Sequence, residues 1–275
     1  MTDKYLPSHF SDADRTAKVA ALQSYDKADQ MVTSYAIQQR LAKEPVTPRM
    51  LTGLPSLDRL TEGVGAGEVV VVAGHPKHGK SLLMQTITHN LARQEIHAAW
   101  FSYELTNRQF LSRFPDLPYF AMPQYLAERA MPWLSDRIWE GKLKFGIRHV
   151  FIDHLHYLVD LAKAHNASLE IGAIMRALVR IAIEHEVVIW LAAHVTKRSK
   201  EQSADTPPTD ADLRDSSLIG GEASTVLTVH RKRLSPNLPD MSEDATVTVC
   251  LCRQTGAMYK SFVVTKRGGW LAEGG

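Results

Sequence analysis

The sequence predicts an α/β fold: a mostly parallel central sheet with a C-terminal β-hairpin and an N-terminal helical arm. Three observations predict it. Apolar runs without polar alternation, typical of strands buried on both faces, occur near residues 68–74, 97–105, 148–153 and 186–194. Segments with helical periodicity separate these runs. Three β-rich stretches follow toward the C-terminus, at residues 224–230, 245–252 and 259–265.

Composition is that of an ordinary globular protein. The 275 residues are 44% hydrophobic and 23% charged, so the chain can bury a real core. The formal net charge of +2 gives no global basic field, and any nucleic-acid surface must therefore be local. Cys250 and Cys252 cannot form a disulfide framework and fit a reducing compartment. We expect them to share one face of a strand, with metal ligation as the alternative.

Neither a membrane span nor an export signal is expected. No apolar run approaches membrane-spanning length. The first residues, MTDKYLPSHFSDAD, carry acidic side chains and lack the apolar centre of a signal peptide. We therefore expect a cytoplasmic protein without a membrane partner.

The N-terminal region differs in composition from the rest. Residues 11–44 are polar and helix-favouring, without glycine or proline, and Ser11 or Asp12 is a candidate helix cap. We expect residues 1–45 to form a helical arm or linker and residues 46–275 to form the main domain. The alternative is a helix packed on its own domain.

One stretch carries a phosphate-binding motif. Residues 74–81 read GHPKHGKS and fit G-x-x-x-x-G-K-[ST] at every specified position. The two glycines let backbone N–H groups surround a polyphosphate, Lys80 reaches its outer phosphates, and Ser81 offers a hydroxyl to Mg²⁺. The positive end of the next helix faces the anion. The sequence predicts that a nucleoside triphosphate binds to Gly74, His75, Pro76, Lys77, His78, Gly79, Lys80, Ser81 and Leu82.

Three further polar side chains lie at the carboxyl ends of predicted strands. They are Glu104, Asp153 and His194. Ligands of open parallel sheets bind at this edge. Hydrolysis of a γ-phosphate needs a carboxylate for the metal and a group that orients water. We expect Asp153 to bind Mg²⁺, Glu104 to polarise the attacking water, and His194 to contact the γ-phosphate or the water; for Glu104 and His194 alone, surface roles are equally open.

The order of these motifs resembles a known family. TG-x-x-x-LD, GHPKHGKS, SYEL, VFIDHLHYLV, VVIWLAAHVTK, DLRDSS and CRQTG follow one another as in the RecA-type motor domain of the DnaB-like hexameric replicative helicases. The phage primase–helicases and mitochondrial Twinkle are the most similar branch. The resemblance covers about residues 50–273. It implies a RecA-like P-loop NTPase fold.

The resemblance implies a role for several residues. Glu104 is the catalytic base, Asp153 the Walker B carboxylate, and His194 the γ-phosphate sensor. Arg253, in the R-x-T-G turn, acts as an arginine finger on the neighbouring subunit's nucleotide. The channel loops that grip single-stranded DNA contain Lys197, Arg198, Lys200 and Arg214.

The resemblance also implies a function. We expect a helicase motor in the form of a homo-oligomeric, six-membered ring. It would hydrolyse ATP or another NTP with Mg²⁺ and unwind DNA during replication in a bacterial or phage-infected cell. A separate primase or loader is a candidate partner. Two alternatives remain open, a RecA-type ATPase of recombination or repair and a nucleotide-gated regulatory ATPase. One departure is Leu251, where phage relatives often place a basic residue.

Overall fold

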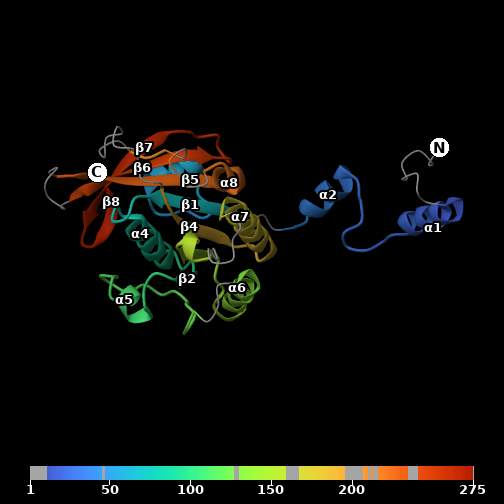
Figure 1. Cartoon of the computed structure of the whole chain (residues 1–275), viewed down its shortest axis with the longest axis horizontal. Helices are drawn as coiled ribbons and strands as arrows, with labels where there is room; N and C mark the ends of the chain where they lie inside the picture. Colours follow the sequence, from blue (N-terminus) through green and yellow to red (C-terminus); the bar gives the residue numbers. More distant parts are fainter. Residues whose placement is uncertain are drawn as a thin grey trace. The chain divides into compact units, whose positions relative to one another are not determined.

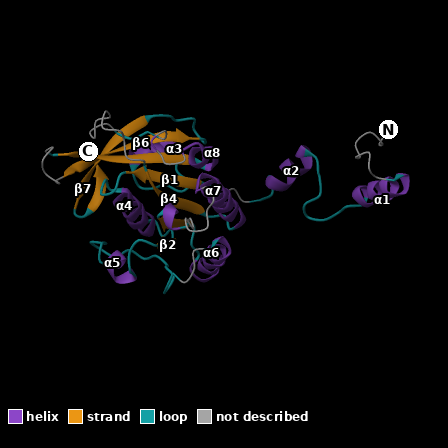
Figure 2. Cartoon of the chain, in the orientation of Figure 1, coloured by secondary structure: helices purple, strands orange, loops and turns teal. Residues whose placement is uncertain are grey.

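The computed structural model describes residues 11–44, 47–126, 130–158, 167–195, 207–209, 212, 216–234 and 241–274. The chain divides into an N-terminal arm, Met1–Val46, and a body, Thr47–Gly275. Figure 1 follows the chain by colour from one terminus to the other, and Figure 2 distinguishes its helices from its strands.

The arm contains two short helices. Helix α1 spans Asp12–Gln23 and helix α2 spans Ser34–Leu41. Ser11 Oγ accepts the N–H of Asp14 at 3.3 Å, so the predicted N-cap is confirmed. The prediction of one helical stretch up to residue 44 was wrong. Thr33 has extended backbone and its Oγ1 accepts the N–H of Ala36 at 3.2 Å, which makes it the cap of a second helix.

An eight-stranded sheet forms the centre of the body, in the order β2-β3-β4-β1-β5-β6-β7-β8. Strands β2, β3, β4, β1 and β5 pair in parallel, and β6, β7 and β8 continue the sheet in antiparallel pairs. The predicted, mostly parallel sheet is therefore confirmed. The strands are β1 (Val69–Gly74), β2 (Ala98–Ser102), β3 (His149–Asp153), β4 (Val188–His194), β5 (Thr225–Arg233), β6 (Met241–Cys252), β7 (Lys260–Arg267) and β8 (Trp270–Glu273).

Helices cover both faces of this sheet (Figure 1). Side chains alternate along β1, so Val69 and Val71 enter one core cluster while Val70 and Val72 enter the other. The first cluster includes side chains of α6, α7 and α8, and the second includes side chains of α3, α4 and α5. The helices of the body are α3 (Pro55–Thr61), α4 (Lys80–Arg93), α5 (Asn107–Leu111), α6 (Met131–Phe145), the 3-10 helix η1 (Leu155–Tyr157), α7 (Ala167–Glu184) and α8 (Ser216–Glu222).

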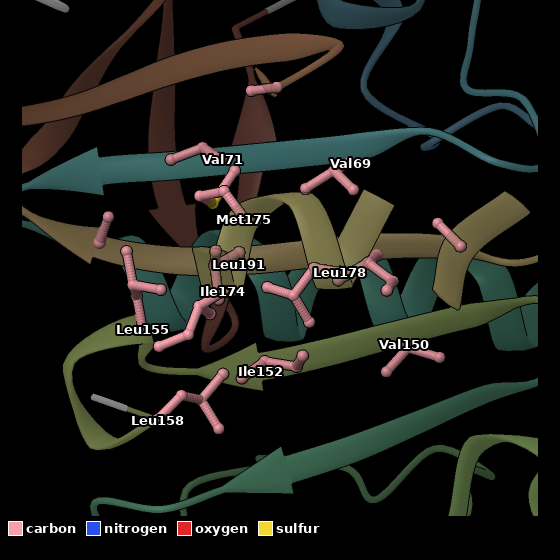
Figure 3. Close-up of a cluster of buried hydrophobic side chains, with 14 of the residues drawn as sticks. Val69, Val71, Val150, Ile152, Leu155, Leu158, Ile174, Met175, Leu178 and Leu191 are labelled. Atoms are coloured by element: carbon pink, nitrogen blue, oxygen red, sulfur yellow. The ribbon is translucent and has the colours of Figure 1, made fainter. Parts of the chain in front are cut away.

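Helix α7 anchors the strands that carry the site (Figure 3). Its side chains Ile174, Met175 and Leu178 lie over the sheet, against a cluster that contains Val71 of β1 and Leu191 of β4. All five side chains are buried. Burial of one such side chain contributes about 1.5–3 kcal/mol, so this packing fixes the relative positions of the central strands.

The described helices include none that is both long enough and apolar enough to span a membrane.

The C-terminal strands form more than the predicted hairpin. Strands β5, β6, β7 and β8 make three successive antiparallel pairs. The sequence prediction missed β8, which has only four residues, Trp270–Glu273, and follows a turn containing Gly268 and Gly269. A run this short has too few residues for alternation to be recognised.

Cys250 and Cys252 lie on opposite faces of the sheet, so the same-face prediction was wrong. Cys250 belongs to the core cluster on the α7 side, and Cys252 belongs to the cluster on the α4 side. The pairing of β5 with β6 shifts register here: Val226 pairs with Leu251 and Leu227 with Val249, so Cys250 is an extra residue in β6. Such a bulge adds one residue and reverses the alternation beyond it. Neither cysteine forms a disulfide with the other, and both are buried.

Asp58 organises the turn that leads into α3. Its Oδ1 accepts the N–H and the hydroxyl of Thr52 at 2.7 and 2.8 Å, and its Oδ2 accepts the N–H of Gly53 at 3.0 Å. Thr52 is fully buried. Burial raises the pKa of Asp58, and the hydrogen bonds from Thr52 and Gly53 oppose that rise. The carboxylate thus satisfies the backbone donor of buried Thr52 as well as that of exposed Gly53.

Replacing Asp58 by alanine should lower the free energy of unfolding by about 2 kcal/mol, because the N–H groups of Thr52 and Gly53 lose a charged acceptor. Urea unfolding of Asp58→Ala measures the loss. Asp136→Ala, at an exposed position of α6, is the matched control and should change stability by less than about 0.5 kcal/mol. Equal stabilities for the two variants would contradict this role of Asp58.

Candidate functional site

The phosphate-binding motif forms the loop between β1 and α4. Gly74 ends β1 so close to β5 that a Cβ atom would lie 2.6 Å from the carbonyl oxygen of Val229. Gly79 precedes α4 with a φ of 102°, a conformation that favours glycine. Gly74 is therefore required by the close approach of β5, and Gly79 is required by its left-handed backbone. Pro76 and Lys77 are exposed, and Leu82 is half-buried on α4.

Lys80 lies at the centre of the site. It is 6% exposed, and its Nζ donates to the carbonyl oxygens of Gly74 at 2.9 Å and His75 at 3.1 Å. The Nδ1 atom of His194 lies 3.4 Å from the same nitrogen. Burial lowers the pKa of Lys80 to about 8, against the opposing effect of the Asp153 and Glu104 charges. The ammonium is thus held by neutral acceptors at the mouth of the loop.

Ser81 and Asp153 meet across the loop. The hydroxyl of Ser81, in the first turn of α4, donates to Oδ2 of Asp153 at 2.7 Å. Asp153 ends β3 and is 5% exposed, and burial raises the pKa of its carboxyl group. A hydroxyl and a carboxylate are the oxygen ligands that Mg²⁺ prefers, so the two residues predicted for the metal fit it chemically.

Glu104 follows β2 at the same edge of the sheet. Strands β2 and β3 pair Ser102 with Asp153, and the N–H of Tyr103 donates to the Asp153 carbonyl at 2.8 Å. Glu104 is exposed. Its negative charge raises the pKa of both Lys80 and Asp153, which places the carboxylate beside the site. Its position leaves the carboxylate accessible to water.

Histidines form a cluster beyond Lys80. Nε2 of His194, at the end of β4, lies 3.0 Å from Nε2 of His154, and the ring centroids are 4.2 Å apart. Burial lowers the pKa of His154 to about 3 and that of His194 to about 4, and the nearby Lys80 charge adds to both shifts. Both rings are therefore neutral at pH 7.

A contact that the sequence did not predict joins the loop to β5. The N–H of Arg231 donates to Nδ1 of His78 at 3.1 Å, and the rings of His78 and His230 lie 5.1 Å apart. The pKa of His78 is lowered to about 4, mainly by burial and next by the charge of nearby His230. No local pattern signals this contact, because the two partners are far apart in the chain and meet only through the pairing of β1 with β5.

Arg253 lies in the turn after β6 and contacts α8. Its Nε donates to the carbonyl of Ala223 at 2.8 Å, and its Nη2 donates to the carbonyls of Gly221 at 2.6 Å and Gly220 at 3.3 Å. These are carbonyls at the C-terminal end of the helix, where a cation is favoured. The structure brings Lys80, Ser81, Glu104, Asp153 and His194 together, whereas the guanidinium of Arg253 is bound at the C-terminal end of α8.

The predicted DNA contacts lie outside the described residues. They are Lys197, Arg198, Lys200 and Arg214.

Replacing His78 by asparagine should make stability less dependent on pH between 7 and 5. The folded-state pKa of His78, about 4, lies below its ordinary value of 6.5, so the unfolded chain binds more protons in this window. The contribution of His78 to the free energy of unfolding is therefore fully present above pH 6.5 and is lost as the pH falls toward 4. Asparagine keeps an acceptor for the Arg231 N–H but does not titrate.

Urea unfolding of the native chain and of His78→Asn at pH 7 and pH 5 measures the difference. Between pH 7 and pH 5, the free energy of unfolding of the native chain should fall by about 1 kcal/mol more than that of the variant. This figure allows for the half-exposed position of the ring. Identical losses would contradict a half-buried, neutral His78.

The chain is similar to bacterial replicative helicases. The replicative DNA helicase DnaB of Mycoplasma genitalium (strain ATCC 33530 / DSM 19775 / NCTC 10195 / G37) is 28% identical over 225 residues, which cover 68% of this chain and 47% of that protein. The replicative DNA helicase DnaB of Treponema pallidum (strain Nichols) is 28% identical over 228 residues, which cover 72% of this chain and 51% of that protein. The chain thus spans about half the length of these relatives.

Solved structures share the fold. A DnaB-like replicative helicase, described with its interactions with primase, superposes with a TM-score of 0.72 at 17% identity, covering 95% of this chain and 71% of that one. A solved ATPase domain gives a TM-score of 0.70 at 17% identity, covering 88% of this chain and 96% of that one. A family model, the DnaB-like helicase C terminal domain, matches residues 50–116 and 130–266. Because these ranges make up well over half of the chain, the chain belongs to the family of the DnaB-like helicase C-terminal domain.

Proposed function

We propose that this chain is the motor of a ring-forming DNA helicase. It hydrolyses ATP, or another NTP, at subunit interfaces and translocates on single-stranded DNA to unwind duplex DNA during replication. One observation carries the proposal: the phosphate loop, Ser81, Asp153 and His194 converge at one edge of the sheet in a chain of this family. The family match supports this reading over a repair ATPase or a regulatory ATPase.

Contacts around Lys80 and Ser81 support a nucleotide site here. The Lys80 ammonium donates to carbonyl oxygens and contacts His194, and the outer phosphates of a bound nucleotide would replace these partners. Ser81 and Asp153 would hold Mg²⁺, whose charge offsets the negative charge that develops during phosphoryl transfer. Glu104 is exposed beside them and orients the attacking water as the general base.

Arg253 is proposed to complete the site of a neighbouring subunit. Its guanidinium donates to carbonyls at the C-terminal end of α8. That position supports action outside its own nucleotide site. An arginine delivered to a γ-phosphate is worth on the order of 10³–10⁵ in rate, so catalysis would require assembly.

The arm supports assembly with other copies of the chain. Its helices and the segment between them expose apolar side chains: Met31 is 96% exposed, Tyr35 76% and Leu22 58%. Apolar side chains in such numbers on a short segment favour burial on a partner. We propose that the arm, residues 1–45, docks on a second copy, that six copies close a ring, and that Lys197, Arg198, Lys200 and Arg214 face DNA in its channel. A primase or loader is a further candidate partner.

The first test compares ATP hydrolysis with and without single-stranded DNA. DNA should stimulate the native chain, and Arg253→Ala should lower the stimulated rate on the order of 10³-fold, because the transition-state charge loses its partner. Arg267→Ala, at an exposed position of β7, is the matched control. Hydrolysis that is indifferent to DNA would favour the regulatory ATPase.

Mixed subunits test whether Arg253 acts in trans. Lys80→Ala and Arg253→Ala should each be inactive alone. Mixed together, they should regain part of the activity, because some interfaces then combine an intact Lys80 with an intact Arg253. A mixture as inactive as its components would contradict action between subunits.

Replacing Lys197 and Arg198 together by alanine should weaken binding to single-stranded DNA. Loss of two phosphate contacts should also reduce the slope of log affinity against log salt by about 1.4. Fluorescence anisotropy with a labelled oligonucleotide at several salt concentrations measures both. Lys260→Ala, at an exposed position of β7, should bind normally. Unchanged affinity in the double variant would place the DNA elsewhere.

A further inference from the structure

A tight turn shapes the backbone of the phosphate loop at residues 75–78. The carbonyl oxygen of His75 accepts the N–H of His78 at 3.3 Å, with Pro76 and Lys77 at the two central positions. Lys77 has a φ of 68°. Proline at the first central position and a positive φ at the second are the features of a type II turn, whose second central position favours glycine. Lys77 therefore occupies a position where a side chain is unfavourable.

Contacts on both sides hold this turn in place. The carbonyl oxygen of His75 also accepts a hydrogen bond from the buried ammonium of Lys80 at 3.1 Å. At the other end, Nδ1 of His78 accepts the N–H of Arg231 at 3.1 Å, which connects the turn to β5. A left-handed backbone at a residue other than glycine persists where its surroundings over-determine it. These contacts therefore keep Lys77 in its unfavourable conformation.

The other left-handed residues of the described chain, glycines apart, have a different explanation. Glu62, Glu95 and Glu186 lie just after the C-terminal ends of α3, α4 and α7, where a left-handed residue commonly ends a helix. Tyr259 directly precedes β7. Lys77 ends neither a helix nor a strand but lies within the loop that fits a polyphosphate. Because strained backbone is found preferentially at ligand sites, its conformation points to a role in binding.

The side chain of Lys77 has no structural role that explains its presence. It is exposed, whereas Lys80 is buried. Among the residues that the structure describes, none forms a hydrogen bond or an ion pair with its ammonium group. The motif G-x-x-x-x-G-K-[ST] specifies no side chain at this position. A lysine thus stands where glycine would be favoured, with its charge available to a ligand.

We propose that Lys77 is a second phosphate-binding lysine of the nucleotide site. The N–H groups of such a loop surround the polyphosphate, so a lysine on its turn lies within reach of the phosphates. The exposed ammonium of Lys77 binds their negative charge in addition to Lys80, and this contact offsets the unfavourable backbone. The role rests on the proposed function, because it requires a polyphosphate in the loop.

Three variants of the full chain separate the charge of Lys77 from its backbone strain. Lys77→Gly and Lys77→Asn remove the charge and suit a positive φ, whereas Lys77→Arg keeps both the charge and the strain. Without nucleotide, the glycine and asparagine variants should unfold at a midpoint about 2–4 °C above native. Both should bind nucleotide about five-fold more weakly, as expected for the loss of one exposed ionic contact, while the arginine variant should stay within about two-fold of native.

Isothermal titration calorimetry with Mg²⁺ and AMP-PNP, an ATP analogue that is not hydrolysed, measures the affinity. At about 0.5 M salt the difference between native and the two neutral variants should shrink to less than about two-fold, because screening weakens an exposed ionic contact. Glu95→Gly is the matched control. Glu95 is exposed and left-handed but lies outside the loop, so this variant should raise the unfolding midpoint and leave the affinity unchanged.

A chain that is more stable and yet binds nucleotide more weakly would support the proposal, because unfolding cannot explain the weaker binding. Native affinity in Lys77→Asn would overturn it, even if Lys77→Gly binds weakly, since flexibility of the loop would then be the cause. Lys80→Ala separates this proposal from the proposed function. If Lys80→Ala weakens binding and the neutral variants at position 77 do not, the nucleotide site stands and the role of Lys77 fails. If the native chain binds no nucleotide, both fail.

Discussion

The buried ammonium of Lys80 is the constraint on which this structure depends. A charge that is 6% exposed needs acceptors around it, and here two carbonyl oxygens of the loop accept from it while Nδ1 of His194 lies 3.4 Å away. The ring of His194 in turn lies 3.0 Å from that of His154, which directly follows Asp153 of β3. The buried Lys80 thus lies next to groups at the ends of β3 and β4.

The register of the parallel strands brings the residues around Lys80 together. Strands β1 and β4 pair Gly74 with His194, and strands β2 and β3 pair Ser102 with Asp153, so the carboxyl ends lie at one edge. Parallel strands place their carboxyl ends together without further design, which explains why ligands bind there. Helix α7 packs on β1 and β4 and holds this edge in place. The packing of the core therefore determines the positions of the site residues.

The sequence reveals those parts of the site that depend on local order. Lys80 and Ser81 belong to a contiguous motif, and Asp153 and His194 end apolar runs that have no polar alternation. The contact of His78 with Arg231 depends on how β5 pairs with β1, and no periodicity carries that information. The prediction for Cys250 and Cys252 fails for a related reason, since a bulge interrupts the alternation on which it rests.

The contact of Arg253 with α8 connects two parts of the proposed machine. The guanidinium is bound by the last carbonyls of a helix that follows residues 196–215 in the chain, where the proposed DNA contacts lie. If Arg253 acts on a neighbour's nucleotide, it must first leave these carbonyls. Its release would then depend on the conformation of the C-terminal end of α8, which supplies these carbonyls.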